Sequence, residues 1–214
     1  MENYKQKFIS LSLEIGALKF GEFQLKSGRI SPYFFNMGLF SSGPLIKNIG
    51  DFYAAALVSS NINYDIVFGP AYKGIPIVTA LAASLSTSYQ LDKPFVYNRK
   101  EIKNHGEGGV TVGEELRGNV VIVDDVITAG TAIREAVDII NNAGATTTGI
   151  VISLDRQERG VGDLSAVKEI SNTLNIPVIS IVNLDEVIDY IDNNPSDYGQ
   201  HIDKIKKYRE EYGA

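Results

Sequence analysis

Several residue types are scarce in this 214-residue chain, and each scarcity excludes a class of site. Cysteine is absent, which excludes disulfide bonds and thiolate-held metals. Only two histidines are present, so a histidine-rich zinc site is not expected. Basic residues number 20 against 26 acidic ones. The resulting net charge of −6 makes the chain a poor candidate for wrapping nucleic acid.

Long apolar runs are missing as well. The longest mostly apolar stretch, IPIVTALAASL, is far shorter than the roughly 20 residues that cross a bilayer. The first ten residues, MENYKQKFIS, lack the apolar region of a signal peptide. We therefore expect a cytoplasmic protein without membrane contact. Neither G-x-x-x-x-G-K-[ST] nor G-x-G-x-x-G occurs, which disfavours a P-loop or a dinucleotide fingerprint.

Short apolar segments alternate with helical patterns through most of the chain. DIVFGP, PFVYNRK, GNVVIVDD, TTTGIVISLDR and PVISIVN predict strands, and the segments between them have helical spacing. Such alternation is typical of an α/β fold with a parallel sheet covered on both faces. Before these strands, FGEFQLKSGRISPYFFNMG alternates around a turn and predicts a hairpin.

The stretch VVIVDDVITAGTA, residues 120–132, joins an apolar strand to paired carboxylates and a loop of small residues. Asp124 and Asp125 fall at the carboxyl end of the strand, where open parallel sheets bind ligands. The small residues after them let backbone N–H groups approach an anion, and the next helix adds its positive N-terminus. Carboxylates repel phosphate but suit hydroxyl groups or magnesium. Ribose 5-phosphate, with vicinal hydroxyls beside a phosphate, fits both halves.

Basic residues gather in two other segments. GPAYKGIP places Lys73 in a tight turn at a helix start, where a cation opposes the helix dipole. NRKEIKNHGEGG is rich in basic residues and glycine, and it begins a stretch predicted to be an unstructured loop, about residues 101–113. Such a run is commonly a solvated charge cluster, or it is a loop that closes over a bound polyanion.

Two further features could recognise a planar, charged ligand. Phe34 and Phe35 are adjacent in a predicted strand and point in opposite directions, so at most one of them can lie over a ring. Arg156 follows another strand. It could form a surface ion pair with Asp155 or Glu158, or it could pair bidentately with a planar carboxylate.

Together these segments resemble the type I phosphoribosyltransferase family. VVIVDDVITAGTA is similar to the family motif that binds phosphoribosyl pyrophosphate (PRPP). FGEFQLKSGRISPYFFN, FGPAYKGIP, YNRKEIKNHGEGG and ISLDRQERG extend the resemblance, over nearly the whole chain, to the bacterial branch that uses orotate. The resemblance implies one domain, residues 1–214, with the type I fold: a mostly parallel central sheet flanked by helices, and a small N-terminal hood at about residues 1–40.

The resemblance also implies an activity and a set of site residues. The reaction would transfer the 5-phosphoribosyl group from PRPP to orotate, with Mg²⁺ near Asp124 and Asp125 held mainly by substrate oxygens and water. Lys103 and the two aspartates would be catalytic. PRPP contacts are implied for Lys26, Tyr72, Lys73, Arg99, Lys100, Lys103, His105, Asp124, Asp125, Val126, Ile127, Thr128, Ala129, Gly130, Thr131 and Ala132. Orotate contacts are implied for Lys26, Phe34, Phe35, Thr128 and Arg156.

The resemblance further implies a homodimer in which loop 101–113 of one subunit acts at the site of the other. Two alternatives stay open. The first is a phosphoribosyltransferase for another base, against which Arg156 argues because a purine has no carboxylate to pair with it. The second is a PRPP-sensing regulator that binds nucleic acid, against which the acidic composition argues.

Overall fold

The computed structural model describes residues 3–25, 27–103, 109–160 and 162–214, without the side chains of residues 102, 103, 196 and 197. The predicted alternation of strands and helices is confirmed. The main strands are β3 (Ile66–Gly69), β4 (Phe95–Lys103), β5 (Gly109–Gly113), β6 (Asn119–Asp124), β7 (Thr146–Asp155) and β8 (Val178–Asn183). The helices are α1 (Asn3–Glu14), α2 (Gly43–Ser59), α3 (Gly74–Tyr89), α4 (Thr131–Asn142), α5 (Ala166–Leu174), α6 (Leu184–Asp192), α7 (Pro195–Tyr198) and α8 (Ile202–Tyr212).

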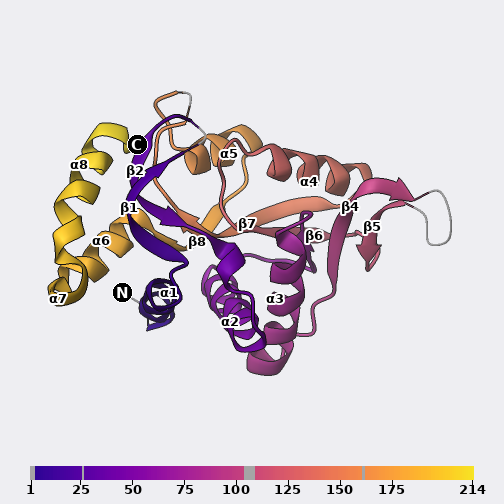
Figure 1. Cartoon of the computed structure of the whole chain (residues 1–214). Coiled ribbons are helices and arrows are strands. Elements are labelled where there is room, and N and C mark those ends of the chain that lie inside the picture. Colours follow the sequence, from indigo (N-terminus) through magenta and orange to yellow (C-terminus); the bar gives the residue numbers. More distant parts are fainter. Residues whose placement is uncertain (1–2, 26, 104–108, 161) are drawn as a thin grey trace.

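The central sheet has the strand order β5-β4-β3-β6-β7-β8, and all its neighbours are parallel except β4 and β5. Helices cover both faces (Figure 1). Successive residues of β6 point to opposite faces. Val121 and Val123 belong to the core beneath α2 and α3, whereas Val120 and Ile122 belong to the core beneath α4 and α5. A strand buried on both faces must be apolar throughout, which explains the uninterrupted VVIV.

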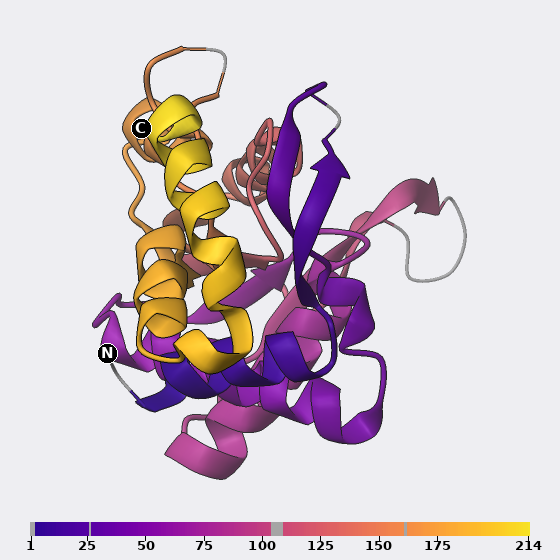
Figure 2. The same cartoon turned by 60° about the vertical axis from the view of Figure 1, so that its left-hand side comes forward.

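The predicted hairpin is also confirmed. β1 (Leu18–Gln24) pairs antiparallel with β2 (Ile30–Phe35), with a register shift between Phe20 and Phe23. Helix α8 contacts β2, and Figure 2 shows the indigo hairpin and the yellow α8 standing above the sheet layer. The hairpin and the C-terminal helix therefore cover one end of the sheet together, although they lie at opposite ends of the chain.

The prediction of an unstructured loop at residues 101–113 is wrong where the structure describes it. β4 continues to Lys103, and β5 pairs with it from Gly109 to Gly113. The alternating Val110-Thr111-Val112 supplies a strand pattern that the flanking glycines hid in the sequence. Residues 104–108 lie outside the described residues. Across the described chain, no helix is long and apolar enough to cross a membrane.

Candidate active site

The polar residues singled out by the sequence meet at one edge of the sheet. Asp124 ends β6, Lys73 follows β3, and Arg156 follows β7. These three strands are parallel neighbours, so their carboxyl ends lie together. This is the edge at which open parallel sheets bind ligands.

Asp124 is a buried carboxyl group with an altered acidity. Burial raises its pKa from 3.8 to about 7, and the neighbouring charge of Asp125 adds to the increase. The backbone N–H of Asp125, which donates to Asp124 Oδ1 at 2.9 Å, opposes the increase, as do the charges of Lys73 and Lys100. A carboxyl group in this state can hold or release a proton near neutral pH.

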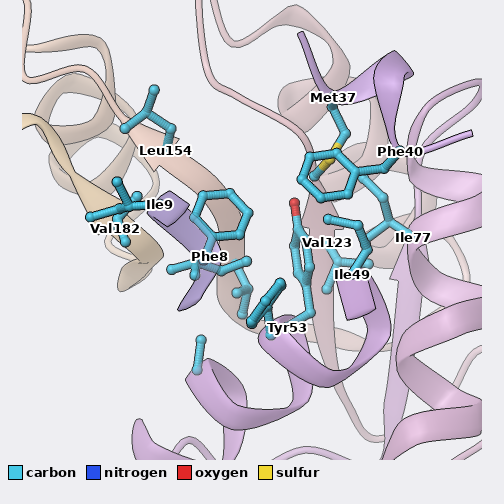
Figure 3. Packing of buried hydrophobic residues seen from close by; sticks show 14 of the residues in the cluster. Phe8, Ile9, Met37, Phe40, Ile49, Tyr53, Ile77, Val123, Leu154 and Val182 are labelled. Carbon is cyan, nitrogen blue, oxygen red and sulfur yellow. The ribbon is translucent and has the colours of Figure 1, made fainter. Parts of the chain in front are cut away.

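The backbone of the two aspartates is fixed from the core. The hydroxyl of Tyr53, on α2, donates to the Asp124 carbonyl at 2.7 Å, and Tyr53 is fully buried among core residues (Figure 3). On β7, the backbone N–H of Ser153 donates to the Asp125 carbonyl at 2.8 Å, and the Ser153 hydroxyl donates to the same oxygen. The buried apolar layer thus sets the position of the acidic pair.

Asp125 forms an ion pair with Lys73. The side chain of Asp125 is 10% exposed and that of Lys73 is 60% exposed, so the lysine ammonium faces solvent beside a mostly buried carboxylate. A bound anion could therefore reach Lys73 without displacing core residues.

The turn that carries Lys73 depends on two glycines. A β-carbon on Gly69 would lie 2.2 Å from the Gly74 carbonyl oxygen, and one on Gly74 would lie 2.7 Å from the Gly69 carbonyl carbon. No side chain fits at either position. Between them, Tyr72 is 72% exposed.

The loop after Asp125 is anchored to both faces of the sheet. Val126 packs against the core beneath α2 and α3, and Ile127 is buried in the core beneath α4 and α5. Thr128, Ala129 and Thr131 are exposed above these anchors. The loop therefore presents hydroxyl groups and backbone to solvent while its base is fixed.

Gly130 ends this loop and begins α4. Its φ of 73° lies in the left-handed region, and a β-carbon there would lie 2.4 Å from Ile170 Cδ1. As the N-cap, Gly130 has no side chain to accept from the first N–H groups of α4. Those donors and the positive end of the helix are available to an anion, which fits the predicted phosphate cradle.

The basic residues on β4 lie beside this edge. Lys100 Nζ is 3.6 Å from a carboxylate oxygen of Glu135, on α4, and Arg99 Nη1 donates to the Gly109 carbonyl at 3.3 Å. Lys26 and His105 lie outside the described residues, as does the side chain of Lys103.

Asn98 is a site residue that the sequence reasoning missed. Its side-chain oxygen accepts from the backbone N–H of Ala71 at 2.7 Å, which ties the Lys73 turn to β4. Asn98 is buried, and a single amide within the apolar strand PFVYN was the available signal.

Phe34 and Phe35 point in opposite directions, as predicted. Phe34 is 40% exposed, and its ring centroid lies 5.5 Å from that of Phe23, whereas the Phe35 ring centroid lies 6.0 Å from that of Phe8 in the core. Only Phe34 presents a ring to solvent. Phe35 could reach a ligand through its backbone.

Arg156 is paired with Glu158, one of the two partners considered from the sequence. Nη2 and Nε donate to Glu158 Oε1 at 2.6 and 3.0 Å. The pair is not a surface ion pair, because the two side chains are only 16% and 13% exposed. The guanidinium lies 4.3 Å above the Tyr33 ring, and burial raises the pKa of the Tyr33 phenol well above its ordinary value.

The chain matches known proteins over its whole length. The family described as phosphoribosyl transferase domain matches residues 40–184. The orotate phosphoribosyltransferases of Mannheimia succiniciproducens and Marinobacter nauticus are 53% and 54% identical to it, and each alignment covers all of both chains. The crystal structure of orotate phosphoribosyltransferase from Francisella tularensis is 44% identical, covers 97% of this chain and 100% of its own, and has a TM-score of 0.88.

Proposed function

The chain belongs to the phosphoribosyltransferase family and to its orotate-specific branch, and from that premise we propose how its strand-end site acts. The reaction joins orotate to PRPP, yields orotidine 5′-monophosphate and pyrophosphate, and serves pyrimidine biosynthesis. The proposal rests on one observation: a buried acidic pair lies between an uncapped helix N-terminus and an exposed lysine.

The ribose 5-phosphate part of PRPP spans the two halves of the opening motif. The 5-phosphate binds to the N–H groups and hydroxyls of residues 128–132, where the α4 N-terminus favours an anion. The ribose hydroxyls bind to Asp124 and Asp125, because carboxylates accept hydrogen bonds from hydroxyl groups. Val126 and Ile127 hold this segment in place from the two cores.

The pyrophosphate part lies toward β3 and β4. Its negative charge is balanced by Lys73 and Lys100, which flank the acidic pair and already influence the pKa of Asp124. The remaining contacts that we propose are Lys26, Tyr72, Arg99, Lys103 and His105.

Magnesium fits this site only as an ion held mostly by the substrate. No group of three or more metal-ligating side chains exists among the residues that the structure describes, and Asp125 is paired with Lys73. Two carboxylates with waters and phosphate oxygens suit Mg²⁺, which keeps several waters. When bound, the ion supplies positive charge to the departing pyrophosphate.

The chemistry is a displacement at the anomeric carbon of ribose. A ring nitrogen of orotate forms the new bond and loses its proton, the bond to pyrophosphate breaks, and the electron pair leaves with the pyrophosphate oxygen, which can take up the released proton. The protein supplies no covalent nucleophile. It aligns the two reactants and neutralises the charge that develops on the leaving group, which are the main contributions available to it.

Orotate binds between the hairpin and the end of β7. Arg156 offers Nη1 to the base, since Nε and Nη2 are engaged by Glu158. Phe34 offers an exposed ring, and Lys26, Thr128 and the Phe35 backbone complete the proposed contacts.

Turnover with alternative bases tests this proposal. PRPP and Mg²⁺ are incubated with orotate, adenine or guanine, and released pyrophosphate is measured. Of the three bases, only orotate is expected to be turned over. Turnover with a purine would point to the other-base alternative, and PRPP binding without turnover of any base would point to a regulator.

We also propose a homodimer in which residues 101–113 serve the partner's site. Lys103→Ala and Asp125→Asn variants are each expected to be nearly inactive as homodimers. In a random mixture half of the dimers are mixed, and each mixed dimer has one intact site, so about a quarter of all sites should be active. Confirmed mixed dimers with no recovered activity would show that the segment serves its own subunit.

A further inference from the structure

We propose that Glu158 is the positioning residue of the base subsite: it holds the Arg156 guanidinium through Nε and Nη2 and leaves Nη1 for the ligand. The inference rests on the proposed function, since it assumes that Arg156 contacts orotate. It assigns a role to a carboxylate whose charge would, without such a role, oppose the binding of an anionic base.

Three of the five N–H groups of Arg156 are engaged within the protein itself. A guanidinium has five N–H groups: one on Nε and two on each terminal nitrogen. Nε donates to Glu158 Oε1, and Nη2 donates to the same oxygen and to Ser31 Oγ at 3.1 Å. The two N–H groups of Nη1 are used by neither Glu158 nor Ser31, so they are the ones that remain for the nearby Tyr208 hydroxyl and for the base.

Glu158 is itself held from the hairpin. The hydroxyl of Tyr33, on β2, donates to Glu158 Oε1 at 2.9 Å, and the Tyr33 ring lies beneath the guanidinium. Three donors therefore converge on one carboxylate oxygen, two from Arg156 and one from Tyr33. Ser31 is fixed in turn by donating to the Tyr33 carbonyl at 2.7 Å.

The C-terminal helix closes this arrangement from behind. Tyr208, on α8, packs edge-on against the Tyr33 ring at a centroid distance of 6.2 Å. Burial raises the pKa of its phenol, and hydrogen bonding to Ser31 and Arg156 opposes that rise, so the hydroxyl lies beside the guanidinium. The guanidinium is thus confined by strand end, hairpin and helix together.

Positioning matters here because arginine has many rotamers. A free arginine loses much side-chain entropy when a ligand fixes it, and that loss weakens binding. Because Glu158 already fixes the Arg156 side chain in the ligand-free protein, little entropy is left to lose when orotate binds. The arrangement also places a negative charge near the orotate carboxylate. Because the held geometry depends on an acceptor oxygen rather than on the charge, an amide at position 158 should replace the carboxylate in part.

Steady-state kinetics of Glu158 variants tests the role. Glu158→Ala should raise the KM for orotate by about 10- to 100-fold, the loss typical of removing hydrogen bonds to a charged group. The KM for PRPP should stay within about twofold, because Arg156 does not contact PRPP. Glu158→Gln should recover most of the loss, and Tyr33→Phe should cause a smaller increase because it removes one of three donors.

Asp51→Asn is the matched control. This carboxylate accepts hydrogen bonds from Lys47 and Ser84 between α2 and α3, so the same acid-to-amide change there should leave both KM values unaltered. Equal increases in both KM values for Glu158→Ala, no increase for orotate, or no recovery with Gln would overturn the positioning role.

A measurement without turnover separates this inference from the proposed function. In the ligand-free protein, the Arg156 Nε–H should exchange slowly with solvent by NMR, and Glu158→Ala should abolish that protection. Fast exchange in the parent protein would overturn the inference whatever the activity. The other outcome is slow exchange of the Nε–H in the parent protein combined with an unchanged KM for orotate in Arg156→Ala. That result would contradict the proposed contact between Arg156 and orotate, and the positioning role depends on that contact.

Discussion

Replacing Asp124 with asparagine should stabilise the ligand-free protein at alkaline pH while impairing its activity. The raised pKa means that the folded chain binds a proton at Asp124 that the unfolded chain has already lost. Between about pH 4 and pH 7, stability therefore falls as pH rises, because the unfolded state holds fewer protons. Asparagine can keep the acceptor for the Asp125 N–H, and it carries no charge to bury.

The magnitude follows from the two pKa values. Moving from the ordinary 3.8 to about 7 corresponds to about 4 kcal/mol, at about 1.4 kcal/mol per pH unit. The part that falls between pH 5 and pH 8 is about 3 kcal/mol, because the change stops near the folded-state pKa. The parent protein should lose this amount of unfolding free energy over that interval through Asp124, and Asp124→Asn should not.

Urea unfolding near pH 5 and near pH 8, without ligands, measures the effect. The comparison is the change between the two pH values in the parent minus the same change in Asp124→Asn, so contributions from other groups cancel. Asp51→Asn controls for the general loss of one acidic group. If the parent and Asp124→Asn lost the same free energy between the two pH values, Asp124 would not be a buried neutral acid.

The same group and its neighbours support three further predictions. Binding of Mg²⁺ and PRPP near pH 6.5 should release up to about one proton per site, because ligands that need a charged Asp124 lower its pKa; equal calorimetric enthalpies in buffers of different ionisation enthalpy would exclude this. Gly130→Ala should cost about 1–2 kcal/mol of stability and weaken PRPP binding, since a β-carbon is strained at its φ of 73° and meets Ile170; thermal unfolding and PRPP titration would measure both effects. Arg156→Ala should raise the KM for orotate far more than that for PRPP, and equal changes in the two would argue against its contact with the base.

Much of the fold could be predicted from the sequence because most strands had a strong local signature. A parallel strand buried on both faces must be apolar throughout, so the segment VVIV predicts β6 without information about the neighbouring strands. β5 gave a weaker signal. It lies at the sheet edge, pairs with one strand only, and carries an exposed Val110 between glycines. Its strand state depends on β4, which a local pattern does not contain.

Some features of the candidate site could also be predicted from the sequence, and others could not. The acidic pair and the helix N-terminus are contiguous in sequence, so their proximity followed from one motif. The acidity of Asp124 did not, because it depends on burial and on Lys73 and Lys100, which are brought in by other strands. The full set of contacts around Arg156 could not be predicted from the sequence either. Glu158 is two residues away, but Tyr33 is more than a hundred residues distant and arrives only when the hairpin packs.

The turn from Gly69 to Gly74 constrains how the gene can vary. Any change in a glycine codon that replaces glycine with another amino acid introduces a β-carbon. At either position that atom would collide with the backbone of the other glycine. We therefore expect no single amino-acid substitution to be accommodated at either position. In a saturation library selected for growth without added pyrimidine, we expect both positions to tolerate no replacement. Tyr72, which lies between them, is exposed, so lack of space does not restrict its replacement. This turn is where the geometry of the backbone, more than any side chain, limits how far the sequence can drift.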